Sequence, residues 1–160
     1  MTIQVGDKIP ACTTLKVMGS KGPQGITTAE LFDGKKVVMF AVPGAFTPGC
    51  SLTHLPGYVV KADEIKAKGV DSIICLSVND AFVMGAWGKN QNAEHLIMLA
   101  DGNADFTKAM GLEMDGTGFG MGIRCKRMAM IIDKGVVTHF AIEPPGGIVV
   151  SAADAILKLL

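Results

Sequence analysis

The sequence predicts an α/β domain with a central mixed β-sheet and helices on both faces, and residues 1–160 form a single domain. Two continuous apolar runs, residues 36–42 (KVVMFAV) and 71–78 (DSIICLSV), are typical of buried parallel strands. The segment between them carries apolar side chains at helical spacing and stops at Gly69. Near the C-terminus, residues 127–133 and 136–142 flank a Lys-Gly turn signal, which predicts an antiparallel hairpin.

The elements at the two ends of the chain are predicted from their capping residues. Thr27 and Glu30 have capping-box spacing, which predicts a short helix. Ser151 can cap a final helix over residues 152–160. Pro56 should kink the long helix between the two apolar runs, or divide its first turns from the rest.

The middle of the chain continues the alternation of helices and strands. A helix over residues 81–87 can be capped by Asn79 or Asp80, and a strand over 96–100 precedes a short helix over 104–110. The glycine-rich residues 118–122 are expected to form a flexible loop. A thioredoxin-like domain has this layout, and a flavodoxin-like sheet is the alternative that the pattern leaves open.

Composition and charge exclude several classes of partner. Hydrophobic residues make up 49% of the chain and charged residues 19%, which is typical of a globular protein with a sizeable core. Fifteen basic and fifteen acidic residues give a formal net charge of +0, so no field of one sign attracts nucleic acid or an anionic membrane. No targeting segment is visible and the apolar run at residues 37–42 is too short to span a bilayer, so the expected compartment is the cytoplasm.

The most informative stretch is residues 43–58, PGAFTPGCSLTHLPGY, which follows the first buried strand and opens a helix. Thr47 fits the N-cap and Pro48 fits the first helical position, so Cys50 falls at the third position. The N–H groups of a first turn lack intrahelical acceptors and the helix dipole is positive there, so a thiolate is stabilised. We expect the Thr47 hydroxyl to accept from the helix and to contact whatever binds at the sulfur, within a loop stiffened by Pro43.

This stretch resembles the peroxiredoxin family. Pro43-x-x-x-Thr47-x-x-Cys50 matches the family's PxxxTxxC motif, and the fuller VPGAFTPGCSxxHLPGY is similar to the type II, or peroxiredoxin 5-like, subfamily. The likeness continues through residues 69–89, 121–133 and 151–160. It implies a thioredoxin-like fold and a thiol peroxidase that reduces hydrogen peroxide and alkyl hydroperoxides, with roles in antioxidant defence and redox homeostasis.

The resemblance also implies a catalytic arginine on a later strand. Arg127 is the position that matches, and Arg124 is the nearby competitor for the role. A guanidinium beside the sulfur favours the thiolate and orients the peroxide oxygens. The implied mechanism is attack of the Cys50 thiolate on one peroxide oxygen, which leaves a sulfenic acid.

A sulfenic acid has to be cleared by a second thiol. Some type II relatives carry a resolving cysteine after the EP-x-G segment, but residues 143–152 here contain none. Cys75, in a context that plant-like members share, is the possible internal resolving residue, although its strand is predicted to be buried. The other route is an external thiol, either glutathione with glutaredoxin or thioredoxin, which serves as co-substrate. The resemblance implies no cofactor and no metal, and a homodimer.

Other interpretations of these residues stay open from the sequence. Cys12 and Cys125 are expected to be bystanders, and Cys75 is equally well explained as a small core residue. His54 lies four residues after Cys50 and shares its helix face, which allows a Cys–His hydrolase dyad or a metal pair, although packing is the simpler role. A redox sensor that uses the same reactive thiol without turnover is the alternative to an enzyme.

Overall fold

The two predicted buried strands lie side by side and parallel at the centre of a seven-stranded sheet. They are β3 (Lys36–Ala41) and β4 (Ser72–Ser77), and β5 (Ile97–Ala100) continues the parallel part beyond β4. On the other side of β3, β8 (Met128–Asp133) pairs antiparallel, followed by β9 (Val136–Ile142). The computed structural model describes residues 1–160, and its mixed α/β architecture confirms the predicted fold class.

Alternation along β3 builds two cores, one on each face of the sheet. Val38 and Phe40 belong to one buried cluster, whereas Val37 and Met39 belong to the other. This period of two is the consequence of strand geometry, and both sets are apolar because helices cover both faces.

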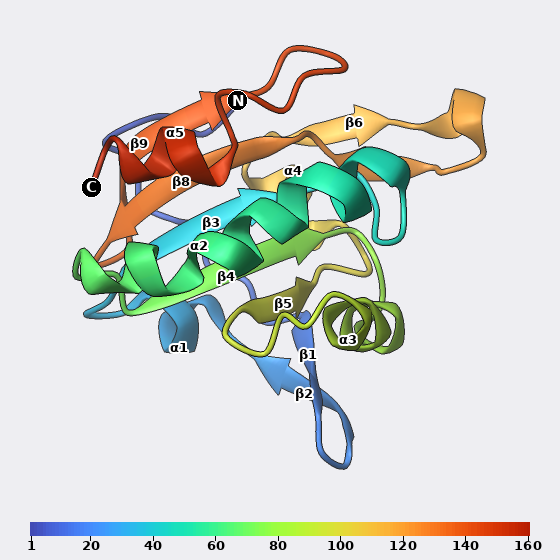
Figure 1. Ribbon diagram of the computed structural model, residues 1–160. Coiled ribbons are helices and arrows are strands. Elements are labelled where there is room, and N and C mark those ends of the chain that lie inside the picture. Colours follow the sequence, from blue (N-terminus) through green and yellow to red (C-terminus); the bar gives the residue numbers. More distant parts are fainter.

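The first face is covered by α2 (Leu55–Ala67), α3 (Ala81–Asn90) and α5 (Ala153–Leu157). The second face is covered by α1 (Thr28–Phe32) and α4 (Asp105–Ala109), together with the N-terminal segment. Figure 1 shows α2 and α5 lying side by side across the sheet, with α1 on the opposite side. No helix combines the length and the apolar character that crossing a membrane requires.

The helix after β3 is divided at its start, as Pro56 predicts. A π-helical turn, η1 (Cys50–His54), precedes α2, and the N–H of Leu55 donates to the carbonyl of Cys50, five residues back. Pro56 has no N–H to continue the regular α-helical pattern, which favours the wider turn. The irregular helical turn therefore begins at Cys50 itself.

Two short hairpins are absent from the sequence prediction. The first, β1 (Leu15–Gly19) with β2 (Gly22–Ile26), adds an edge to the sheet beside β5, so that the strand order is β2-β1-β5-β4-β3-β8-β9. The second pairs β6 (Glu113–Asp115) with β7 (Ile123–Cys125) and has the 3₁₀ turn η2 (Thr117–Phe119) at its tip, where the prediction was a loop. Both are rich in glycine, which weakens the strand signal.

Capping predictions are confirmed at two helices and wrong at the last. Thr27 and Glu30 form the complete capping box of α1, and the Asp80 carboxylate accepts from the N–H of Val83 at the start of α3. Ser151, however, does not cap α5, whose N-cap is Ala152 and which ends at Leu157. The Ser151 hydroxyl instead donates a hydrogen bond to the Glu143 carboxylate, with 2.6 Å between the two oxygens.

Candidate active site

Cys50 lies in the first turn of the helix that follows β3, with its side chain fully buried. Helical structure begins at Pro48, and the N–H of Ser51 donates to the carbonyl of Thr47 at 2.9 Å, the first bond of the helix. Cys50 therefore occupies the third helical position, as the sequence predicts. N–H groups in this turn have no intrahelical acceptor, and together with the helix dipole they favour negative charge on the sulfur.

Arg127, between β7 and β8, is the polar neighbour of that sulfur. Its Nη2 donates to Cys50 Sγ at 3.2 Å, and its Nη1 contacts Nδ1 of His54 at 2.8 Å. A guanidinium has donors only, so Nδ1 of His54 is the acceptor and carries no proton. The fork of Arg127 thus joins the cysteine and the histidine that lie four residues apart on the helix.

The second nitrogen of His54 fixes the ring from the other side. Its Nε2 lies 3.0 Å from the carbonyl oxygen of Ser151, and because Nδ1 is unprotonated, Nε2 carries the proton and donates it. The Tyr58 hydroxyl donates to the same carbonyl at 2.7 Å. Burial, reinforced by the charge of Arg127, lowers the pKa of His54 to about 4, so the ring is neutral near pH 7.

Glu143 holds the segment that supplies this carbonyl. Its carboxylate accepts from the N–H and hydroxyl of Ser151, at 2.8 and 2.6 Å, and from the N–H of Val150 at 3.2 Å. Burial acts to raise the pKa of Glu143, but these hydrogen bonds outweigh it and lower the pKa. The chain of contacts therefore runs from Glu143 through Ser151, His54 and Arg127 to the sulfur.

The loop before Cys50 is tied to two other parts of the molecule. The N–H of Ala45 donates to the Asn79 side chain at 3.0 Å, and Arg124 reaches the carbonyl of Pro43 at 3.4 Å. Arg124 also donates to the carbonyl of Met121 at 2.8 Å, so its guanidinium braces the loop and is not bonded to the sulfur. Of the two arginines considered from the sequence, Arg127 is the one that contacts Cys50.

The Thr47 side chain differs from the prediction. Its hydroxyl donates to the carbonyl of Gly44 at 2.7 Å and does not accept from the N–H groups of the helix. The turn formed by Gly44 to Thr47 brings the two groups together before the helix begins. The Thr47 hydroxyl oxygen therefore accepts no hydrogen bond from the protein.

The remaining cysteines lie in apolar surroundings. Cys75, at the middle of β4, belongs to the same buried cluster as Cys50, and its burial raises the pKa of the thiol. Cys125 belongs to the cluster on the opposite face, where burial raises its pKa to about 12. Cys12 also lies on that face. No arginine donates a hydrogen bond to any of these three sulfurs, in contrast to Cys50.

A Cys–His hydrolase dyad does not fit the geometry, because neither ring nitrogen of His54 faces Cys50. From the sequence, His54 is expected to be a partly buried packing or hydrogen-bonding residue, but its partner Arg127 was not predicted. The only signal in the chain was its spacing of four residues from Cys50, which puts both side chains on one helix face.

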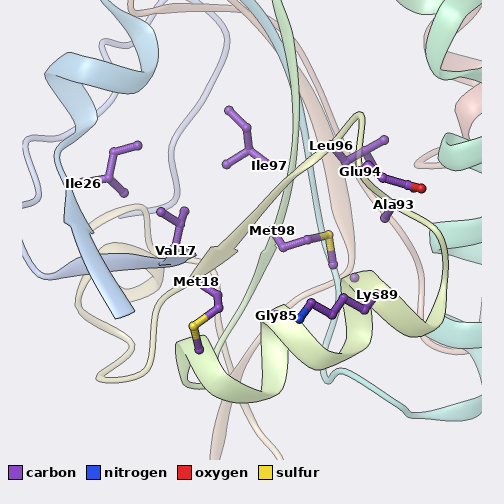
Figure 2. A pocket seen from close by; sticks show the side chains of 11 residues that line it. Val17, Met18, Ile26, Gly85, Lys89, Ala93, Glu94, Leu96, Ile97 and Met98 are labelled. Carbon is purple, nitrogen blue, oxygen red and sulfur yellow. The ribbon is translucent and has the colours of Figure 1, made fainter. Parts of the chain in front are cut away.

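Two grooves of similar size lie on the molecule, and one reaches the site. The first, about 560 Å³, is bordered by β1, β2, α3 and β5, and Figure 2 shows its mainly apolar walls around Met18 and Met98. It contains no cysteine, histidine or arginine. The second, about 540 Å³, is lined by Pro43, Gly49 and Arg127 on its inner side and by the segment after β9 on the other. This second groove borders the site through Gly49, the chain neighbour of Cys50, and through Arg127.

Comparison with known proteins agrees with this geometry over nearly the whole chain. A family model described as Redoxin matches residues 4–157. The chain is 46% identical over 159 residues to Peroxiredoxin-2D of Arabidopsis thaliana, with 99% of this chain and 98% of that protein covered. It is 47% identical over 164 residues to the chloroplastic Peroxiredoxin-2E-2 of Oryza sativa subsp. japonica, covering 99% of this chain and 73% of that protein. The crystal structure of reduced Prx3 from Vibrio vulnificus in complex with H₂O₂ is 57% identical, covers 99% of both chains and superposes with a TM-score of 0.95.

Proposed function

Because this chain belongs to the redoxin family and is a type II peroxiredoxin, and hence a thiol peroxidase, we propose that Cys50 is the residue that attacks the peroxide. The observation that carries this proposal is the 3.2 Å contact from Arg127 Nη2 to Cys50 Sγ in the first turn of a helix. Of the four cysteines, Cys50 alone has a cation on its sulfur. The thiolate is the reactive form of the side chain, and this environment favours it.

The reaction is a displacement at oxygen. The Cys50 thiolate attacks the terminal oxygen of the hydroperoxide, an S–O bond forms, and the O–O bond breaks. The sulfur is oxidised by two electrons to a sulfenic acid, and the leaving oxygen takes a proton and departs as water or an alcohol. Arg127 retains further N–H donors that can stabilise charge on the two oxygens as it develops.

Thr47 and Pro43 complete the site in different ways. Since the Thr47 hydroxyl gives its hydrogen to Gly44, its lone pairs are left to accept from the O–H of a peroxide. Pro43 borders the groove and has no N–H, so it shields the sulfur without competing for the substrate. Hydrogen peroxide and alkyl hydroperoxides are the proposed substrates. The structure of the Vibrio protein, a complex with H₂O₂, supports the first of them.

An external thiol is the proposed reductant of the sulfenic acid, supplied as glutathione with glutaredoxin or as thioredoxin. Cys75 is the internal alternative, but it is fully buried within β4 and its raised pKa keeps it a thiol. A Cys50–Cys75 disulfide would require the turn at residues 48–54 to open. In this cycle the thiol is a co-substrate, and the chemistry needs no bound cofactor and no metal.

We also propose that residues 1–160 act as a single domain and associate as a homodimer. Three large apolar side chains near the site are exposed: Phe46 (52%), Leu52 (78%) and Phe82 (65%). Phe46 contacts Trp87 of α3 with ring centroids 6.4 Å apart, which ties the loop before Cys50 to the helix that carries Phe82. A second copy that covers this patch would remove it from water.

Location in the cytoplasm stays a prediction, since one of the matched relatives is a chloroplastic protein.

Chemical trapping of the oxidised sulfur tests the proposed function. The reduced protein is treated with one equivalent of H₂O₂ in the presence of dimedone, which labels sulfenic acids, and its peptides are analysed by mass spectrometry. The label is expected on Cys50 and on none of the other three cysteines. Labelling of Cys12, Cys75 or Cys125 in preference to Cys50 would overturn the assignment.

A further inference from the structure

The groove beside Cys50 is much larger than a molecule of hydrogen peroxide requires. It encloses about 540 Å³, and at its inner end lie Gly49, the neighbour of Cys50, and Arg127. Because the cysteine side chain is fully buried, only a small head group can reach the sulfur. The body of a larger hydroperoxide would have to stay in the groove outside.

The walls of the groove are largely apolar and come from three parts of the chain. Met114 of β6 and Ile142 of β9 lie along it, and residues 144–148 close the far side. Ile148 lies where this wall reaches Gly49 and Arg127, at the inner end of the groove. A Cβ built on Gly49 would lie 3.3 Å from Ile148 Cδ1 and 3.4 Å from Arg127 Nη2. An alkyl or aryl chain is therefore the kind of group that these walls fit.

Lys126 is the free cation of this groove. Its side chain is half-buried and makes no ion pair, since the one salt bridge of the structure joins Lys61 to Glu64. Arg127 is committed to Cys50 and His54. Glu143 also lines the groove, but both oxygens of its carboxylate accept from Val150 and Ser151 of its own loop. A ligand with one negative charge in this groove could thus pair with Lys126.

We propose that Lys126 is a specificity-determining residue: among the organic hydroperoxides that enter this groove, it selects those that carry a carboxylate by pairing with it. The inference rests on the proposed function, because the peroxide group must reach Cys50. The apolar chain lies against Met114, Ile142 and Ile148, the hydroperoxide head points to Cys50, and the carboxylate faces Lys126. The chemical class is that of fatty-acid hydroperoxides.

A matched pair of substrates tests the role of Lys126. Second-order rate constants are measured by stopped flow for a fatty-acid hydroperoxide, below its critical micelle concentration, and for its methyl ester. The two differ in charge and share the apolar chain. In the unmodified protein we expect the acid to react roughly three- to tenfold faster than the ester, the range of a partly exposed ion pair. The ratio should fall towards one in Lys126→Gln and at high salt, and should be kept in the control Lys108→Gln, which alters an exposed lysine near the end of α4.

The outcomes separate this inference from the proposed function. An acid-to-ester ratio near one in the unmodified protein, with rapid reaction of H₂O₂, overturns the selection by Lys126 and leaves the peroxidase intact. No reaction with H₂O₂ at all overturns the proposed function itself. If Lys126→Gln keeps the ratio but slows the reduction of the sulfenic acid by glutathione, which also bears carboxylates, the cation serves the reductant and the proposal is wrong.

Discussion

Arg127 and His54 are joined by a 2.8 Å hydrogen bond in which the guanidinium donates and the unprotonated Nδ1 accepts. The same guanidinium donates to the sulfur of Cys50 through its other terminal nitrogen. Because His54 is held in turn by the carbonyl of Ser151, the direction of the arginine fork depends on a neutral ring in one tautomer. His54 is in this account a positioning residue, which acts on the sulfur through Arg127.

Replacement of His54 tests that positioning. We expect His54→Leu to slow the reaction of Cys50 with H₂O₂ about tenfold, because it removes a charge-assisted hydrogen bond worth about 1.5 kcal/mol. His54→Asn keeps an acceptor close to the position of Nδ1 and should recover most of the rate. Stopped-flow kinetics measure both, with His139→Leu on the exposed face of β9 as the control. Equal rates in His54→Leu and His54→Asn would show that the bond to Arg127 does not set the rate.

The buried histidine also predicts a pH dependence of stability. Burial lowers the pKa of His54 from 6.5 to about 4, so between these values the unfolded chain binds a proton that the native protein does not. Above pH 6.5, His54 is neutral in both the native and the unfolded state, so it should not lower the free energy of unfolding. It should fall as the pH drops towards 4, by on the order of 3 kcal/mol.

Urea unfolding at a series of pH values between 7 and 4 measures this loss. His54→Asn removes the titrating ring, so its stability should fall less over the same range than that of the unmodified protein. His139→Asn, at an exposed histidine, should follow the unmodified protein. Parallel curves for the unmodified protein and His54→Asn would contradict the assignment.

The burial of Cys75 predicts that it is dispensable for turnover. Cys75→Ala should retain peroxidase activity with glutathione and glutaredoxin, because a buried thiol of raised pKa in the centre of β4 is a poor nucleophile. Non-reducing mass spectrometry of the oxidised protein should show no link between Cys50 and Cys75. Trp87 offers a second readout, since its indole N–H donates to Ser51 Oγ at 2.9 Å and would lose that partner if the turn opened. A Cys50–Cys75 disulfide with a change in tryptophan fluorescence would favour internal resolution.

The exposed patch formed by Phe46, Leu52 and Phe82 predicts self-association. Phe82→Asp places a charge in that patch and should shift sedimentation velocity from dimer to monomer at micromolar concentration, because an unpaired charge is costly to bury. Val60→Asp serves as the control, since Val60 is 76% exposed on α2 and outside the patch. Sedimentation as a monomer in the unmodified protein would rule out the proposed dimer.

What the sequence predicted well depends on short-range rules. The place of Cys50 in the first turn follows from Thr47 and Pro48, which are its near neighbours. The division of the helix near Pro56 was predicted, although the π-helical form of its first turn was not. These are local consequences of backbone chemistry.

What the sequence did not predict depends on contacts between distant segments. His54 meets Arg127 across 73 positions and the carbonyl of Ser151 across 97, and no local pattern encodes those distances. Ser151 had a plausible local role as a helix cap, but the carboxylate of Glu143 competes for its hydroxyl and holds it. The β1–β2 hairpin was missed for a related reason. Pro23 and the glycines weaken its strand signal, and β1 also pairs with β5, which is distant in the sequence.

The most direct test of the central claim is the rate of H₂O₂ consumption by single cysteine variants in the presence of a thiol reductant. Cys50→Ser removes the sulfur that Arg127 contacts, so consumption should fall to the rate without protein. Cys12→Ser and Cys125→Ser should keep the rate of the unmodified protein, because both cysteines lie on the opposite face of the sheet. Circular dichroism checks that each variant is folded. Full consumption of peroxide by folded Cys50→Ser would contradict the account.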